Sequence, residues 1–199
     1  GKPKEAAPRV TAYRQGEYLL MKKERSAEPV EDWAFEADAA DDDVSRGNER
    51  MLLAHHTKDV LAATNWLIKA LAPEQADAFK NAAEMHDYGK ADRRFQEYLA
   101  GRRWSGEDAR LLAKSGRPFE PGKERELRRE FGVPGGFRHE MLSMQLAMQS
   151  KGLVEDGGRE GMLHLIAAHH GHARPLAPVV KDTEPGAVTI GELRLAGEE

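Results

Sequence analysis

The sequence predicts a mainly α-helical bundle, with one short β-hairpin near the N-terminus. In four stretches between residues 48 and 170, apolar residues recur every three or four positions, which is the pattern of helices that bury one face. Only residues 10–23 and 187–195 have the composition of short strands. A chain of 199 residues is long enough for one domain with a substantial core, or for one domain and an appendage.

Composition excludes several classes of protein. The net charge is -4 and the pI is about 6.1, so the chain as a whole presents no basic field to nucleic acid, and any phosphate-binding surface must be local. Without cysteine, a metal site must use histidines and carboxylates. No apolar run approaches membrane-spanning length, and the N-terminus lacks the apolar core of a signal peptide. We therefore expect a soluble cytoplasmic protein that has no membrane partner.

Residues 1–47 are expected to be an N-terminal linker or appendage. Within them, residues 13–18 form the predicted turn of the hairpin. From Glu28 to Asp43 there are eight acidic residues and no basic ones. Such a run is typical of a solvated, poorly ordered linker, although a metal-binding role is a second interpretation.

The first predicted helix covers residues 48–71. Asn48 is a suitable N-cap, and Pro73 follows the end of the helix. His56 lies in the centre of the apolar stripe, so its imidazole is expected to face the core, whereas His55 lies on a mixed face. The stripe consists of Leu52, His56, Val60, Ala63 and Leu67.

A second helix, predicted over residues 74–85, leads directly into His86 and Asp87. An imidazole beside a carboxylate suits manganese, iron, cobalt, nickel or zinc. If this stretch is helical, Lys90 lies on the same face, where its charge could hold a phosphate against the metals. Gly89 either ends the helix or allows a close approach of two backbones.

Residues 91–135 are expected to be less regular. Between residues 102 and 130 there are nine Lys or Arg and six Asp or Glu, with Trp104 and Phe119 among them. Basic residues with aromatics suit a rim that binds single strands. The alternative is a solvated face, with loops at residues 115–116 and 121–122.

Two further helices are predicted over residues 137–150 and 159–170. His139 lies in the first turn of the former, on an apolar face. His169 and His170 lie on or beside the apolar face of the latter, at its C-terminal end.

Six candidate ligands thus lie on the inward faces, or at the ends, of the four predicted helices. Burying so many imidazoles without partners would be costly, and a metal cluster would satisfy them. His164 points away from this group and is interpreted as structural. His172 follows Gly171 in a turn, where it would touch substrate or nothing. The six are His56, His86, Asp87, His139, His169 and His170.

Four segments, taken in order, resemble the HD superfamily of metal-dependent phosphohydrolases. The finer resemblance is to the HD nuclease domain of the CRISPR-associated helicase-nuclease of type I systems. It implies an HD-domain helical bundle, which we assign to residues 48–199. Residues 1–47 would then be a linker from a helicase that lies N-terminal to this domain. The segments are HTKDV (56–60), HDYGK (86–90) with FQ (95–96), RHEMLS (138–143), and HHG (169–171) with RP (174–175).

The resemblance implies a centre of up to two divalent ions: manganese, nickel, cobalt or iron, with magnesium as a further candidate. Asp87 would be catalytic and would bridge the two ions, and His86 completes the signature pair. His56 resembles a ligand of the first ion. The residues that resemble ligands of the second ion are His139, His169 and His170.

The implied chemistry is metal-dependent cleavage of single-stranded DNA. The ions would lower the pKa of a bound water, hold the scissile phosphate and stabilise the leaving oxygen. Lys90 would be catalytic and would support the phosphate, with Arg138 or Arg174 at the rim. The implied partners are single-stranded DNA, a superfamily 2 helicase domain on the same or a separate chain, and a CRISPR RNA-guided effector complex.

One departure from the family pattern concerns the first metal. The family closes that site with an aspartate on a further helix, beyond the HHG segment. Here 29 residues follow His170, and Asp182 is the sole aspartate among them, without a matching context. We therefore assign Asp182 no role and expect a domain that is truncated at its C-terminus.

Two alternative functions stay open. An HD phosphohydrolase acting on nucleotides or cyclic nucleotides would need a closed pocket, whereas a nuclease would need an open groove. The sequence motifs at residues 138–140 and 169–171 favour the nuclease. A degraded HD module would bind DNA or a helicase without catalysis. The missing aspartate favours the degraded module, whereas the presence of all six ligands speaks against it.

Overall fold

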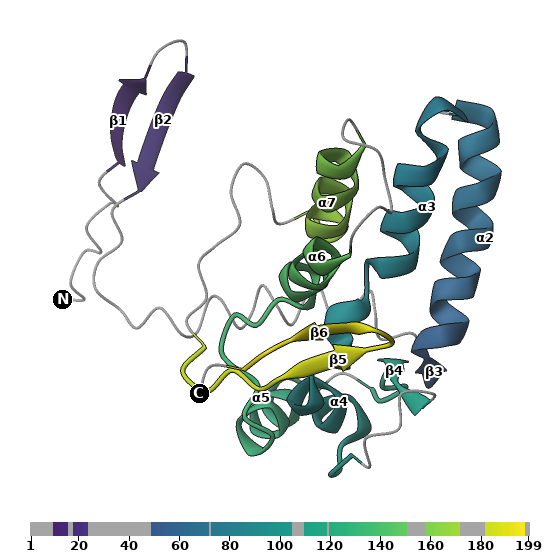
Figure 1. Ribbon diagram of the computed structural model, residues 1–199. Helices are drawn as coiled ribbons and strands as arrows, with labels where there is room; N and C mark the ends of the chain where they lie inside the picture. Colours follow the sequence, from purple (N-terminus) through teal and green to yellow (C-terminus); the bar gives the residue numbers. More distant parts are fainter. Residues whose placement is uncertain are drawn as a thin grey trace.

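Four helices form the upper part of the molecule in the computed structural model (Figure 1). They are α2 (Leu53–Leu71), α3 (Ala76–Met85), α6 (His139–Gln149) and α7 (Arg159–Ala168). Helix α3 packs against both α2 and α7, and α7 packs against α6. The structure describes residues 10–15, 18–23, 49–71, 73–104, 110–118, 120–150, 158–171 and 182–197.

A short 3-10 turn, η2 (Tyr88–Ala91), links the upper helices to the lower part of the molecule. It packs against α6 and leads into α4 (Arg93–Ala100), next to which lies α5 (Pro121–Glu130). Asp92 begins α4 by accepting hydrogen bonds from the amides of its first turn. The turn η2 therefore lies where the two halves of the bundle meet.

Three small two-stranded antiparallel sheets complete the described part of the fold. The strand β3 (Met51–Leu52) pairs with β4 (Leu112–Lys114) beside η2 and α4. The hairpin of β5 (Val188–Ile190) and β6 (Leu193–Leu195) lies against η2 and α6 (Figure 1). The remaining elements are η1 (Pro73–Gln75), β1 (Val10–Gln15) and β2 (Tyr18–Lys23).

Apolar clusters hold η2 in place. Ala91 of η2 is buried in one cluster with Leu146 of α6 and Val188 of β5. Phe95 and Tyr98 of α4 belong to another cluster, which reaches β4. Removal of this apolar surface from water stabilises the turn by roughly 25 cal/mol for each Å² buried.

The mainly α-helical prediction is confirmed, as is the N-terminal hairpin, in which Gln15 lies opposite Tyr18. The helices predicted over residues 74–85, 137–150 and 159–170 are present with ends shifted by one or two positions. Several predicted features lie outside the described residues: the acidic run 28–43, Asn48, Phe119, His172 and Arg174.

The predicted start of the first helix, and the second half of its stripe, are wrong. Helix α2 begins at Leu53 because the two residues before it pair with β4. Ala63 is exposed and Leu67 is 46% exposed, whereas Ile68 is buried. The buried residues Leu53 and Ile68 each follow a residue of the predicted stripe by one position, so the helix turns a neighbouring face toward the core.

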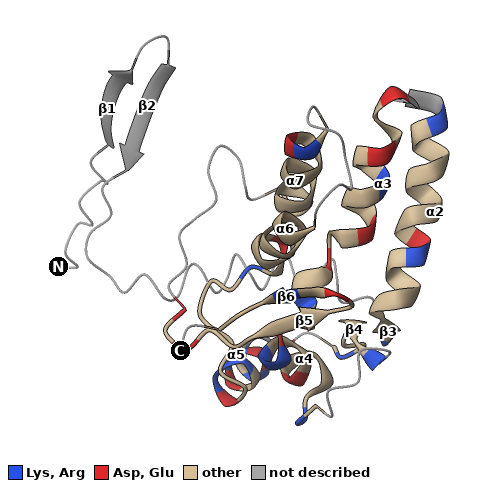
Figure 2. Ribbon diagram, viewed as in Figure 1, with Lys and Arg blue, Asp and Glu red and all other residues tan. Residues whose placement is uncertain are grey.

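Residues 91–135 are more regular than expected, because they contain α4 and α5. The predicted loop at residues 121–122 is instead the start of α5, where proline is favoured because its missing N–H would have no partner. Basic and acidic residues mix along α5 (Figure 2), and most of them are exposed, as on a solvated face, although Glu124 and Arg128 are buried. Trp104 packs against the core, which does not suit a stacking platform.

The single strand predicted at residues 187–195 is wrong as well. The chain turns at Gly191, which has a φ of +55°, and so makes two strands. In the described part of the chain, no helix is both long enough and apolar enough to cross a membrane.

Candidate metal centre

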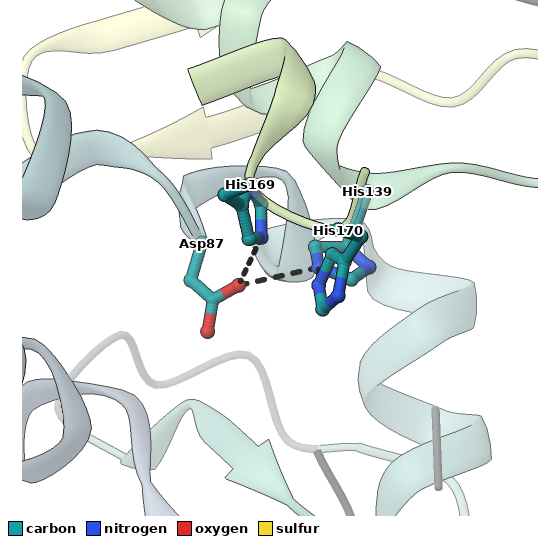
Figure 3. Close-up of side chains that lie close together, drawn as sticks. All are labelled: Asp87, His139, His169 and His170. Atoms are coloured by element: carbon teal, nitrogen blue, oxygen red, sulfur yellow. Dashed lines mark hydrogen bonds and ion pairs between the residues drawn. The ribbon is translucent and has the colours of Figure 1, made fainter. Parts of the chain in front are cut away.

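Asp87, directly after α3, is 1% exposed and lies at the centre of the predicted ligands. Its Oδ1 atom lies 3.2 Å from Nε2 of His139 and 3.7 Å from Nε2 of His169 (Figure 3). The Nε2 atom of His170 lies 3.0 Å from that of His139. These four side chains each offer one ligand atom, all within 4.8 Å of one another.

The other oxygen of Asp87 faces a second group. Its Oδ2 atom lies 3.3 Å from Nε2 of His56 and 3.4 Å from Nε2 of His86. The ammonium of Lys90 donates to the same oxygen at 2.8 Å, and to the carbonyl of Ala113 at 3.3 Å. The two histidines and Asp87 form a three-ligand cluster, so one carboxylate belongs to both clusters.

A close backbone approach brings Asp87 to α6. The amide of Gly89 donates to Oγ of Ser143 at 2.7 Å. A Cβ at residue 89 would overlap the carbonyl oxygen of His139, so only glycine fits. The close approach expected at Gly89 is therefore what positions Asp87 against the first turn of α6.

Hydrogen bonds orient two of the imidazoles. Nδ1 of His86 lies 2.8 Å from the carbonyl of Ala83, and Nδ1 of His169 lies 2.7 Å from the carbonyl of Ile166. A carbonyl only accepts, so Nδ1 of each ring carries a proton. Both Nε2 atoms therefore face Asp87, where they are placed to bind a metal, as in metal-binding histidines.

The donor atoms fit a divalent metal. Oδ1 of Asp87 is buried and makes no hydrogen bond among the described residues, despite lying 3.2 Å from His139. The Nε2 atom of His86 faces the other oxygen at 3.4 Å. A cation bound at Oδ1 would satisfy this buried acceptor. A set of imidazole nitrogens and carboxylate oxygens without sulfur suits the first-row transition metals.

The electrostatics leave most of these side chains ready to bind metal, although burial at His86 is outweighed by the Asp87 carboxylate, which raises the pKa of this histidine. Burial raises the pKa of Asp87, but the Lys90 ammonium and the adjoining imidazoles outweigh it and hold that pKa well below its usual range. Burial, with the neighbouring histidines, lowers the pKa of His170 to about 3, and burial also lowers those of His139 and His56. At neutral pH the carboxylate is ionised and these imidazoles are neutral, which metal binding requires.

The comparisons with known proteins agree with this geometry. The family model described as "Cas3, HD domain" matches residues 37–189. The chain belongs to the Cas3 HD domain family. No curated protein and no solved structure gives a match. The resemblance drawn from four sequence segments is thus confirmed, and the chain is a metal-dependent phosphohydrolase domain of the CRISPR-associated type.

All six predicted ligands of this HD domain come together in the two clusters. That they bind metal is still a prediction. His55 and His164 are both exposed. His164 therefore lies away from the two ligand clusters, as expected, but it is not the packed structural residue that was predicted. Asp182 is held by Arg94 at 2.8 Å and is not among the described ligand groups.

Two buried polar residues of the HD domain received no role from the sequence. Ser143 and Gln96 lie within the segments that carry the resemblance, and both have no exposed surface. Their partners are a backbone amide of η2 for Ser143, and backbone groups of η2 and β4 for Gln96. The sequence places each of these polar residues beside an apolar helix face, which was the available signal that they are buried. Their hydrogen-bond partners are too distant along the chain to be predicted from one sequence.

Proposed function

We propose that this HD domain cleaves single-stranded DNA in type I CRISPR interference by hydrolysing its phosphodiester bonds. The observation that carries the proposal is the carboxylate of Asp87, whose two oxygens face two separate ligand clusters. When bound there, up to two divalent ions would supply an activated water and stabilise the charge of the scissile phosphate. Manganese, nickel, cobalt and iron suit these ligands, and magnesium is a further candidate.

Each cluster would hold one ion. Oδ1 of Asp87 would serve the cluster whose other ligands lie on α6 and at the end of α7. Oδ2 would serve the cluster formed with His56 and His86. The buried carboxylate would thus hold both ions at one phosphate, which is the arrangement that phosphodiester hydrolysis by two metals requires.

The exposure of the centre favours a strand over an enclosed small molecule. The side chains of His56 and His169 are 22% and 20% exposed, and each faces a different oxygen of the buried Asp87. Ligands that reach the surface are accessible to a chain of nucleotides. This supports the nuclease over a phosphohydrolase of free nucleotides, for which a closed pocket was expected.

Lys90 would act through Asp87. Its ammonium is 2% exposed and donates to Oδ2 of Asp87, so it would fix the carboxylate and offset the negative charge that an incoming phosphate meets. Arg138 is paired with Glu140 at 3.0 Å and lies one residue from His139. Arg138 and Arg174 would contact the phosphate of the substrate.

The proposed partners are single-stranded DNA, a superfamily 2 helicase domain on the same or a separate chain, and a CRISPR RNA-guided effector complex. A helicase would supply the single strand, which is more flexible than the stiff duplex and can therefore bring a phosphate to a recessed centre. The proposed location is the cytoplasm.

Cleavage of circular single-stranded DNA tests the proposal. With manganese, nickel or cobalt, the protein should nick the circle, and chelation should stop it. His169→Ala and His170→Ala should abolish cleavage with the helical circular dichroism retained, while His164→Ala, an exposed histidine on the same helix, should behave as wild type.

The alternatives give different results. An intact circle with hydrolysis of a nucleotide or cyclic nucleotide would support the phosphohydrolase. An intact circle that is bound, with none of these substrates hydrolysed, would support a degraded binding module. Full activity of both His169→Ala and His170→Ala would contradict the ligand assignment.

A further inference from the structure

Gln96 of α4 has no exposed surface and is held by three hydrogen bonds. Its Nε2 donates to the carbonyl of Lys90 at 2.6 Å and to that of Leu112 at 3.0 Å. Its Oε1 accepts from the amide of Leu112 at 2.8 Å. Both amide protons and one acceptor are thus used, a set that a carboxylate or an apolar side chain cannot reproduce.

These bonds fix both ends of Lys90. Gln96 holds the backbone of Lys90 directly. It also holds Leu112, the neighbour of Ala113, whose carbonyl accepts from the Lys90 ammonium at 3.3 Å. That ammonium donates in turn to Oδ2 of Asp87 at 2.8 Å. One side chain on α4 therefore ties η2 to β4 and sets where the buried cation lies.

We propose that Gln96 is a positioning residue of the metal centre, which keeps the Lys90 ammonium on Oδ2 of Asp87. The same oxygen lies 3.3 Å from His56 and 3.4 Å from His86. Loss of Gln96 therefore disturbs the three-ligand cluster directly, and the four-ligand cluster on Oδ1 much less. The inference rests on the metal centre of the family, and not on single-stranded DNA as the substrate.

The test compares three variants of the full chain. Gln96→Met removes all three bonds at similar volume, and Gln96→Glu keeps the acceptor but turns a carboxylate toward two carbonyls. Leu112→Ala is the matched control. It removes a buried side chain from the apolar cluster that contains Phe95, the neighbour of Gln96, but keeps the backbone groups that Gln96 binds. Each protein is titrated with Mn²⁺, and its unfolding by urea is measured without metal.

The cluster with three ligand atoms is expected to hold the weaker ion and the cluster with four the tighter one. The two Gln96 variants should bind the weaker Mn²⁺ ion about 10- to 100-fold less tightly, the usual effect of losing a group that orients metal ligands. Binding of the tighter ion should change much less. In a His56→Ala background, which lacks the weaker site, Gln96→Met should have no further effect on metal binding. Leu112→Ala should lose stability without changing the ratio of the two affinities.

A second readout needs no metal. The metal-free proteins are reductively methylated, and the modified lysines are found by peptide mass spectrometry. Each protein is held at a sub-denaturing urea concentration chosen so that all have the same stability. Lys90 should stay protected in wild type and in Leu112→Ala. Lys90 should become reactive in Gln96→Met, while the exposed Lys58 reacts equally in all three. Persistent protection of Lys90 in both Gln96 variants would overturn the proposal. The proposal would also be overturned if the Gln96 variants lost affinity for both Mn²⁺ ions equally, in proportion to their loss of stability.

Discussion

Replacing Gly89 by alanine tests whether the contact of η2 with α6 builds the centre. An added Cβ would overlap the carbonyl oxygen of His139, and would lie 2.9 Å from the carbonyl carbon of that residue and 2.7 Å from the amide of Ser143. All three are backbone atoms, which cannot rotate away. Because non-bonded carbons sit best about 3.5–4.0 Å apart, the contact with the carbonyl carbon alone requires η2 to retreat by at least about 0.6 Å, and the nearer oxygen requires more.

That shift has two measurable costs. It stretches the 2.7 Å hydrogen bond from Gly89 to Ser143 and moves Asp87 away from His139. Overpacking of this kind costs about 1–3 kcal/mol. For a chain of this size, about 2–4 °C is lost per kcal/mol, so Tm should fall by about 2–12 °C. The affinity for the tighter metal should fall about 10- to 100-fold.

Calorimetry of the metal-free protein and a Mn²⁺ titration measure both costs. Gly161→Ala is the matched control, since Gly161 lies on α7, which leads to His169, and nothing lies within 4 Å of an added Cβ there. That variant should gain about 0.5–1 kcal/mol, because alanine suits a helix better than glycine. A Gly89→Ala protein with the Tm and metal affinity of wild type would refute the reasoning.

Three further predictions concern the same centre. His56→Ala should lower metal content and cleavage far more than His55→Ala, because His56 lies 3.3 Å from Asp87 whereas His55 is exposed; equal losses would contradict the assignment. Lys90→Met should destabilise the metal-free protein by about 3–5 kcal/mol, the usual cost of breaking a buried ion pair, and bound Mn²⁺ should restore part of this stability. Urea unfolding with and without Mn²⁺ measures both effects. A Lys90→Met protein as stable as wild type would count against the ion pair of Lys90 and Asp87. Mn²⁺ titration with elemental analysis should find one tightly bound ion and one weaker ion, because one cluster has four ligand atoms and the other three; two equally tight ions would mean that a further residue completes the smaller cluster.

Helical periodicity predicted the upper helices because apolar residues recur along one face of each, even though α6 also buries Glu140 and Ser143. Helices α4 and α5 were missed for a different reason. Their charged residues hide the pattern, and α4 is fixed by Asp92 at its start and by Gly101, with a φ of +65°, at its end. The pairing of Met51 and Leu52 with β4 was also beyond prediction, since sixty residues separate the strands.

The candidate site was predictable to the level of its ligands. The spacing of its neighbours was enough to predict that His56 faces inward, although the stripe itself is only partly buried, and the pair at residues 86–87 marked the centre. The division of Asp87 between two clusters, one at each oxygen, depends on how η2 meets α6. The roles of Gln96 and Ser143 depend on backbone groups far along the chain, which no periodicity reports.

The central claim is that one buried carboxylate serves both clusters. Mn²⁺ binding to Asp87→Asn tests it most directly, with His56→Ala and His170→Ala measured beside it. The single change at Asp87 should weaken both ions, whereas His56→Ala should affect only the weaker ion and His170→Ala chiefly the tighter one. An Asp87→Asn protein that keeps either ion at wild-type affinity would contradict a shared carboxylate.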